Sequence, residues 1–299
     1  MNTRSSKHIC IIAWCTFLFY FTAPLFLSMY VMAAPWIEGD FIKLWEKEKS
    51  ERQNPFSPPS PPYQDMVGKT LVERVTGMKF IWVKGGCYEM GCGYWTSDCF
   101  SNEKPVHEVC VDSFWIGKYE VTQRQWKTIM GNNPSSYKIG DDYPVEQVSW
   151  DDIGFFIKRL YKQSDKSYRL PTEAEWEFAA RSRGKKEKYA GGITPDSLAW
   201  YGKNSGMTTH PVGTKQPNGL NIHDMSGNVM EWCFDRHDYE YYRNSPRNNP
   251  AGPPSGAYRV IRGGSWMAFP SYLRTTAREV GSPEFRNGNL GFRLVIPHQ

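Results

Sequence analysis

The part of the chain that follows Gly184 limits most strongly what this protein can fold into. From there to Gln299 the apolar residues lose the three-four spacing of a helix, and Gly, Asn, Pro, Trp and Tyr are dense, with only short stretches that favour strands. Long irregular segments in a compact domain are uncommon and need internal ties, such as metal ions or aromatic packing, to stay ordered. Because the chain has 12 tryptophans, we expect much of this part to be ordered loop.

Regular elements are expected mainly before Gly184. Residues 78–83 favour a strand, and residues 106–118 form a second extended run. Three helices are predicted from their opening residues, which are Thr122 with Gln125, Ser149 with Asp152, and Thr172 with Glu175. The first should end at Gly131 and the third at about Ser182. The second should bury one face, formed by Ile153, Phe156, Ile157, Leu160 and Tyr161.

The N-terminal sequence predicts export. Arg4 and Lys7 precede an apolar run over residues 9–34, and residues 31–33 suit cleavage by a signal peptidase. The run is also long enough to cross a bilayer uncleaved, so residues 1–34 are expected to be a signal peptide or a membrane anchor, with inner-membrane anchorage through residues 9–34 in the second case. Either alternative predicts a periplasmic or otherwise exported protein.

The rest of the chain divides into a linker and one domain. Residues 35–69 should form a short helix and a proline-rich linker, and residues 70–299 the folded domain. The net charge is +5, but Lys and Arg are interleaved with Asp and Glu, so no nucleic-acid partner is expected.

Four cysteines lie close together: Cys87, Cys92, Cys99 and Cys110. In an oxidising compartment such a group most often forms two disulfides, for which the sequence allows three connectivities. A zinc site is the alternative, although the spacing lacks the close cysteine pairs that structural zinc prefers. Cys233 would then be a buried reduced thiol or, with His223 or His237 as a base, a reactive one.

Eight segments, in order along residues 75–297, resemble the formylglycine-generating enzyme (sulfatase-modifying factor) family. They are residues 85–91 (GGCYEMG), 103–107 (EKPVH), 119–122 (YEVT), 143–150 (YPVEQVSW), 168–177 (YRLPTEAEWE), 227–232 (GNVMEW), 262–266 (RGGSW) and 291–293 (GFR). The resemblance implies a single α/β (α+β) domain with the C-type-lectin-like fold of that family. Little regular secondary structure and long ordered loops are implied as well, in agreement with the composition after Gly184.

The resemblance also implies what the chain lacks. Members of this family oxidise a sulfatase cysteine to formylglycine with copper held by two active-site cysteines, since Cu(I) prefers thiolate ligands. Ala268 and Leu273 stand at those two positions, and no cysteine follows Cys233. We therefore expect neither catalytic residues of this kind, nor copper, nor formylglycine production.

A calcium site is the cofactor that the resemblance does imply. The family pattern falls on Asp224, Gly227, Val229 and Glu231, where two carboxylates and two backbone carbonyls would supply the hard oxygens that Ca²⁺ prefers. The alternative is that Asp224 and Glu231 are ordinary solvated or capping acids. A second calcium site of the family is not expected, because Leu198 and Ala199 replace its ligands.

Other enzyme classes leave little trace in the sequence. The six histidines show no zinc-binding spacing, and no phosphate-binding loop is present. Arginines are dense in the last part of the sequence: Arg259, Arg262, Arg274, Arg278, Arg286 and Arg293. These side chains, the arginine series, could tie loops together by ion pairs or line an anion-binding cleft.

The sequence thus predicts a cell-envelope member of this family that binds an unknown protein or small-molecule ligand. The expected cleft consists of Ser265, Trp266, Phe269, Tyr272, Arg274 and Arg278, because aromatic and arginine side chains dominate binding surfaces. The alternative is a periplasmic maturation enzyme, formylglycine-generating or resembling those of siderophore maturation, with an altered active site. Cys233, Ser265 and the arginine series would be its candidate groups.

Overall fold

The computed structural model describes residues 68–298, with the exception of residue 165. The leader predicted over residues 1–34 and nearly all of the linker predicted over residues 35–69 lie outside the described residues. Among the described helices, none is both long and apolar enough to cross a bilayer.

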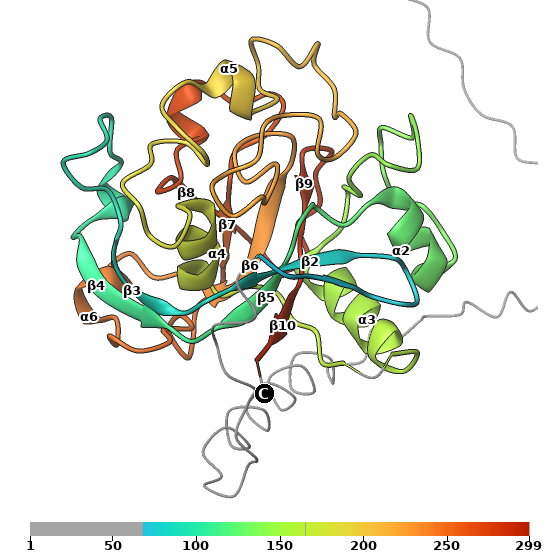
Figure 1. Ribbon diagram of the computed structural model, residues 1–299, viewed down its shortest axis with the longest axis horizontal. Coiled ribbons are helices and arrows are strands. Elements are labelled where there is room, and N and C mark those ends of the chain that lie inside the picture. Colours follow the sequence, from blue (N-terminus) through green and yellow to red (C-terminus); the bar gives the residue numbers. More distant parts are fainter. Residues whose placement is uncertain (1–67, 165, 299) are drawn as a thin grey trace, which may run out of the picture. The chain divides into compact units, whose positions relative to one another are not determined.

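Two four-stranded sheets and one hairpin form the β-structure (Figure 1). The first sheet has the order β1-β2-β5-β10 with antiparallel neighbours, and it joins the start of the domain to its end. Its strands are Thr70–Val72, Lys79–Val83, Phe114–Gly117 and Val295–Pro297. The second sheet has the order β8-β7-β6-β9, and only β6 and β9 run parallel. Its strands, in that order, are Arg278–Gly281, Arg259–Arg262, Met230–Arg236 and Leu290–Gly291. The hairpin pairs β3 (Gly86–Met90) with β4 (His107–Val111).

The three predicted helices are present: α2 (Gln123–Met130), α3 (Trp150–Tyr161) and α4 (Glu173–Ala180). Each has a capping box at its predicted opening, in which Thr122, Ser149 and Thr172 accept the backbone N–H three residues on. The prediction that the third helix runs to Ser182 is wrong by two residues. Ser182 and Arg183 adopt positive φ values of 47° and 69°, which end the helix. Shorter helices are α5 (Pro195–Leu198), α6 (Tyr241–Asn244), and the 3₁₀ turns η2 (Ser101–Glu103) and η3 (Pro270–Tyr272).

The apolar residues pack into two large clusters. The first contains the buried face of α3, and the second surrounds α4, which contacts the β3–β4 hairpin as well as β6 and β7 (Figure 1). Four of the five residues predicted for the buried face of α3 are buried, but Tyr161 is 49% exposed and was wrongly included. It is the last residue of the helix.

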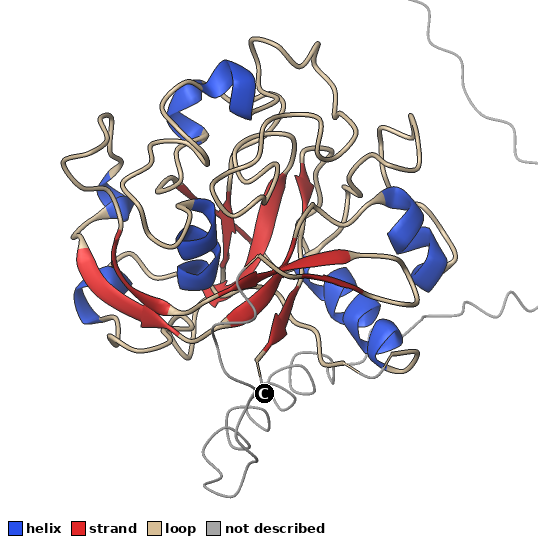
Figure 2. Cartoon of the chain, viewed as in Figure 1, coloured by secondary structure: helices blue, strands red, loops and turns tan. Residues whose placement is uncertain are grey.

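Loops dominate the chain after Gly184, as Figure 2 shows. Two tryptophans tie this part of the chain to distant backbone, Trp232 from strand β6 and Trp266 from a loop. The Trp232 indole N–H donates to the carbonyl of Val148 at 3.0 Å, and that of Trp266 donates to Gly288 at 3.1 Å. The prediction of an α+β fold with long ordered loops is therefore confirmed, and buried indole hydrogen bonds are one physical reason for the order.

Candidate functional site

The loop after β7 contains the two positions at which the family's cysteines are expected. Gly263 and Gly264 have φ values of 96° and 65°, and a Cβ atom at Gly264 would lie 2.7 Å from the carbonyl oxygen of Tyr272. Only glycine permits this close approach, which folds the loop back on itself. Leu273 is fully buried in a cluster with Tyr189, Leu198, Ala199 and Tyr201, and Ala268 packs against the same cluster. The two positions thus contribute apolar packing in place of a thiolate pair.

The residues of the predicted cleft separate into a buried and an exposed group. Ser265, Trp266, Arg274 and Arg278 are each 6% exposed or less. Arg274 forms a two-bond ion pair with Glu103, at 2.5 and 2.6 Å, and Arg278 forms one with Glu173, at 2.5 and 2.7 Å. The inclusion of these four residues in an open cleft was therefore wrong: the two arginines are satisfied by buried carboxylates and do not reach solvent.

Phe269 and Tyr272 remain exposed, at 75% and 39%. Met267, between the turn and Phe269, is 48% exposed. The ring of Tyr272 packs against the ring of Phe100, with centroids 5.2 Å apart. The guanidinium of Arg274, which forms a buried ion pair with Glu103, lies 5.2 Å from the centroid of the Phe100 ring. We call Phe100, Met267, Phe269 and Tyr272 the aromatic surface. The Arg274–Glu103 pair lies under the Phe100 and Tyr272 part of this surface.

The arginine series acts as a set of internal ties. Arg262 pairs with Glu177, Arg274 with Glu103, Arg278 with Glu173, Arg286 with Asp152 and Arg293 with Glu231. Arg259 lies 3.8 Å from the centroid of the Trp150 ring and donates to the carbonyl of Phe234. The ion-pair alternative is therefore confirmed for five of the six arginines. The acidic partners on α4 were not predicted, because three glutamates in eight residues resemble a solvated face in sequence.

The predicted calcium loop lies between a turn and β6. Asp224 and Gly227 have φ values of 59° and 84°, and a Cβ at Gly227 would lie 2.3 Å from the carbonyl oxygen of Trp200. All four predicted ligand residues are buried. The alternative that Asp224 and Glu231 are solvated acids is therefore wrong.

The oxygens of this loop are unequally satisfied. Glu231 accepts two hydrogen bonds from Arg293, at 2.7 Å each, and one from the Trp176 indole at 2.8 Å. Asp224 accepts a single hydrogen bond from the described residues, from the Gly213 N–H at 2.7 Å. Within residues 68–298, the carbonyl oxygens of Gly227 and Val229 accept none. Such open, buried oxygens need a partner.

A third acid, Glu120, belongs to this group and was not predicted. It accepts hydrogen bonds from the side chain of Asn228 and the N–H of Val229, at 2.6 and 3.0 Å. Burial, together with the nearby charges of Asp224 and Glu231, raises the pKa of Glu120 well above its usual value. Burial also raises the pKa of Asp224 to about 6, while the Gly213 hydrogen bond and Arg293 oppose the shift. Three buried carboxyl groups thus share the guanidinium of Arg293.

This donor set fits a hard cation in chemistry and charge. Carboxylate and carbonyl oxygens are the ligands that Ca²⁺ prefers, and a cation would offset the negative charge that raises these pKa values. The described residues contain no grouping of three His, Cys, Asp or Glu side chains that could hold a metal by itself. A calcium ion here would depend on two side chains and the two open carbonyls.

The four cysteines that lie close together in sequence form two disulfides, Cys87–Cys110 and Cys92–Cys99. The disulfide alternative is therefore confirmed and the zinc alternative is wrong. Cys233 is fully buried in β6, and burial raises the pKa of its thiol well above the usual value, with Asp235 and Glu173 adding to the shift. Neither His223 nor His237 hydrogen-bonds to it among the described residues, so Cys233 has no base to activate it.

The sequence model of the sulfatase-modifying factor enzyme 1-like domain matches residues 67–298. The chain belongs to this family. Among its relatives, the chaperone protein LppX of Paenibacillus barcinonensis is 33% identical, over 62% of this chain and 78% of that protein. The formylglycine-generating enzyme of Streptomyces coelicolor is 39% identical, over 52% of each chain. The chain thus spans about half the length of that enzyme.

Solved structures of similar fold include two that the chain covers almost completely. Treponema denticola variable protein 1 has a TM-score of 0.68 and 31% identity, over 77% of this chain and 99% of that one. PvdO from Pseudomonas aeruginosa has a TM-score of 0.71 and 25% identity, over 80% of this chain and all of that one. The family's fold is therefore the fold of this chain.

Proposed function

We propose that this member of the sulfatase-modifying factor family does not oxidise cysteine and acts as an accessory protein that binds a protein partner through the aromatic surface. One observation carries the proposal: apolar packing occupies both positions of the family's thiol pair, while Phe269 beside them is 75% exposed. Exposed large aromatic side chains on a rigid base are typical of binding surfaces.

Two further observations support an accessory role outside the cytoplasm. One relative is named as a chaperone. The two disulfides form and persist in oxidising compartments, which agrees with the export signal predicted over residues 1–34. The alternative of an enzyme with an altered active site has less support, because Cys233 and Ser265 are buried and neither has a hydrogen-bonded base among the described residues.

Calcium is proposed as the resident cofactor. Asp224, Gly227, Val229 and Glu231 would hold it, and the ion would supply the positive charge that the buried carboxylates lack. Its role would be structural, since β6 continues directly from Val229 into the second sheet.

Co-expression with a sulfatase should leave the sulfatase cysteine unmodified. The reason is that no thiol stands at position 268 or 273 to hold copper or to exchange with the substrate. Mass analysis of the target peptide, with a formylglycine-generating enzyme as the positive control, measures this. Formylglycine on that peptide at a level comparable to the control would overturn the proposal.

Photo-crosslinking tests the binding surface itself. A photoreactive amino acid at position 269 or 272 should join the full-length protein, in its own cell envelope, to one reproducible protein. The same group at Tyr239, which is 71% exposed and lies outside the aromatic surface, serves as the matched control. Equal crosslinking patterns at Phe269 and Tyr239 would mean that the aromatic surface has no dedicated partner.

A further inference from the structure

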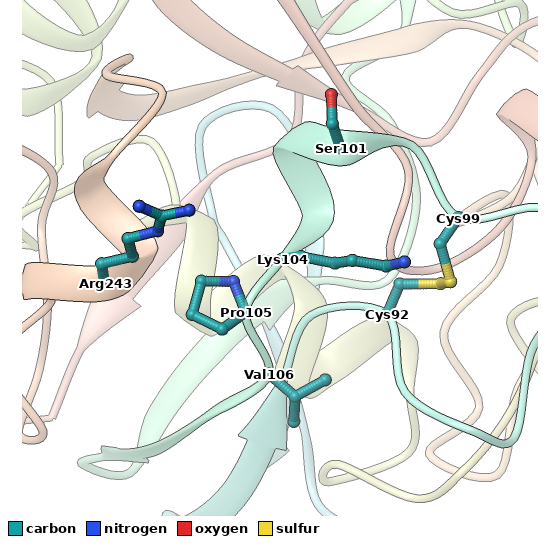
Figure 3. A pocket seen from close by; sticks show the side chains of 7 residues that line it. All are labelled: Cys92, Cys99, Ser101, Lys104, Pro105, Val106 and Arg243. Carbon is teal, nitrogen blue, oxygen red and sulfur yellow. A yellow bond between two sulfur atoms is a disulfide. The ribbon is translucent and has the colours of Figure 1, made fainter.

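A pocket of about 620 Å³ lies beside the Cys92–Cys99 disulfide, and none of its lining residues belongs to the aromatic surface. Its lining residues are Cys92, Cys99, Ser101, Lys104, Pro105, Val106 and Arg243 (Figure 3). The volume is in the range that holds a small molecule. A disulfide that faces such a pocket, with Lys104 beside it and Arg243 on the opposite wall, places a reactive bond within a small molecule's reach.

The charge of the pocket wall is positive. Lys104 extends toward the disulfide in Figure 3, and no acidic side chain of the described residues pairs with it. Arg243 is paired with Glu240 at 2.9 Å, but both side chains are more than half exposed, so water screens this pair. Since none of the lining residues is acidic, an anion is favoured over a cation.

The two sulfur atoms differ in their surroundings. Cys92 is 4% exposed, and its sulfur lies 3.5 Å from Nη1 of Arg274. Cys99 is partly exposed. Nucleophiles therefore reach Cys99 more easily. A thiolate that leaves on Cys92 would lie within hydrogen-bond reach of Arg274, whose charge Glu103 already offsets.

We propose that this pocket is a thiol–disulfide exchange site for small thiols that carry a negative charge. The thiolate of such a molecule attacks the sulfur of Cys99, which breaks the Cys92–Cys99 bond and forms a mixed disulfide with Cys99. The electron pair of the broken bond remains on Cys92 as a thiolate. A second thiolate attacks the external sulfur of the mixed disulfide and releases Cys99 as a thiolate. In total, the two external thiols are oxidised to one external disulfide. Their two electrons and two protons reduce the Cys92–Cys99 disulfide to two thiols.

Two small thiols of equal chain length and opposite charge test the proposal: 2-mercaptoethanesulfonate and cysteamine. The folded full-length protein is treated with each at equal thiolate concentration, the released thiols are alkylated, and peptide mass analysis follows both disulfides separately. At Cys92–Cys99 the anionic thiol should react about tenfold faster than the cationic one, which is the low end of electrostatic steering. The first adduct should be on Cys99.

The Cys87–Cys110 disulfide is the internal reference. Arg247, which lies 4.0 Å from the Cys87 sulfur, has the carboxylate of Glu108 at 2.6 Å, so charges of both signs lie beside this disulfide and little charge preference is expected there. The double variant Lys104→Gln, Arg243→Gln should abolish the preference at Cys92–Cys99 and leave the rate at Cys87–Cys110 unchanged. Failure of Cys92–Cys99 to react in the folded protein, or the same charge preference in the variant as in the wild type, would overturn the proposal. Neither outcome bears on the aromatic surface.

Discussion

Replacing Arg262 with methionine should lower the free energy of unfolding by about 3 kcal/mol, the low end of the usual cost of removing one partner of a buried ion pair, because Glu177 keeps its second ion pair, with Arg181 at 2.8 Å. Arg262 is 1% exposed, pairs with Glu177 at 2.5 Å, and donates to the carbonyls of Thr275, Thr276 and Ala277. Burial acts to lower the pKa of Arg262, but the combined attraction of Glu177, Tyr242 and Glu173 raises it above its usual value, so the guanidinium stays charged. Methionine keeps much of the volume but leaves three carbonyls and one carboxylate oxygen without this donor.

The exposed pair Arg247–Glu108 offers a matched control. Both side chains are 56% exposed, so Arg247→Met should change the free energy of unfolding by less than about 1 kcal/mol. Urea unfolding of both variants, followed by tryptophan fluorescence, measures the difference. Equal effects of the two substitutions would show that the buried arginines do not hold the loops together.

This network also explains why the sequence predicted some elements better than others. The openings of α2, α3 and α4 depend on residues three positions apart, so local sequence is enough to locate them. α4 differs from α3 in its surroundings. All eight of its residues are buried, including Glu173, Glu175 and Glu177. No periodicity shows this, because Arg262 and Arg278, which pair with Glu177 and Glu173, lie in strands 85 and 105 residues away in sequence.

The same limit applies to the candidate site. The family pattern predicts a calcium loop and the positions of the replaced thiols, since both depend on residue identity. It did not distinguish Arg274 and Arg278, which are buried, from Phe269 and Tyr272, which are exposed, because burial depends on Glu103 and Glu173. The connectivity of the disulfides was likewise open in sequence. The register of β3 and β4, which places Cys87 opposite Cys110, decides it.

Removal of calcium should destabilise the protein. If free calcium is 100-fold above its dissociation constant, an excess of chelator should lower the free energy of unfolding by about 2.7 kcal/mol. The physical reason is that Glu120, Asp224 and Glu231 are then buried near one another with Arg293 alone to offset their charge. Urea unfolding in calcium chloride and in EGTA gives this difference. The same free energy of unfolding in both solutions would contradict the proposal that calcium binds the carbonyls of Gly227 and Val229.

Two variants separate loss of the ligand from loss of stability in general. Asp224→Gly removes a carboxylate and tolerates the φ of 59°, so it should abolish the difference between calcium and EGTA. Ile153→Ala, in the apolar cluster at α3, should cost about 2–5 kcal/mol in both solutions and keep the full calcium difference. If the difference in unfolding free energy between calcium and EGTA disappears in both variants, calcium binding depends on the overall stability of the fold and not on Asp224 specifically. A response that survives in Asp224→Gly would place the ion elsewhere, since the described residues offer Asp224 only the Gly213 N–H as another partner.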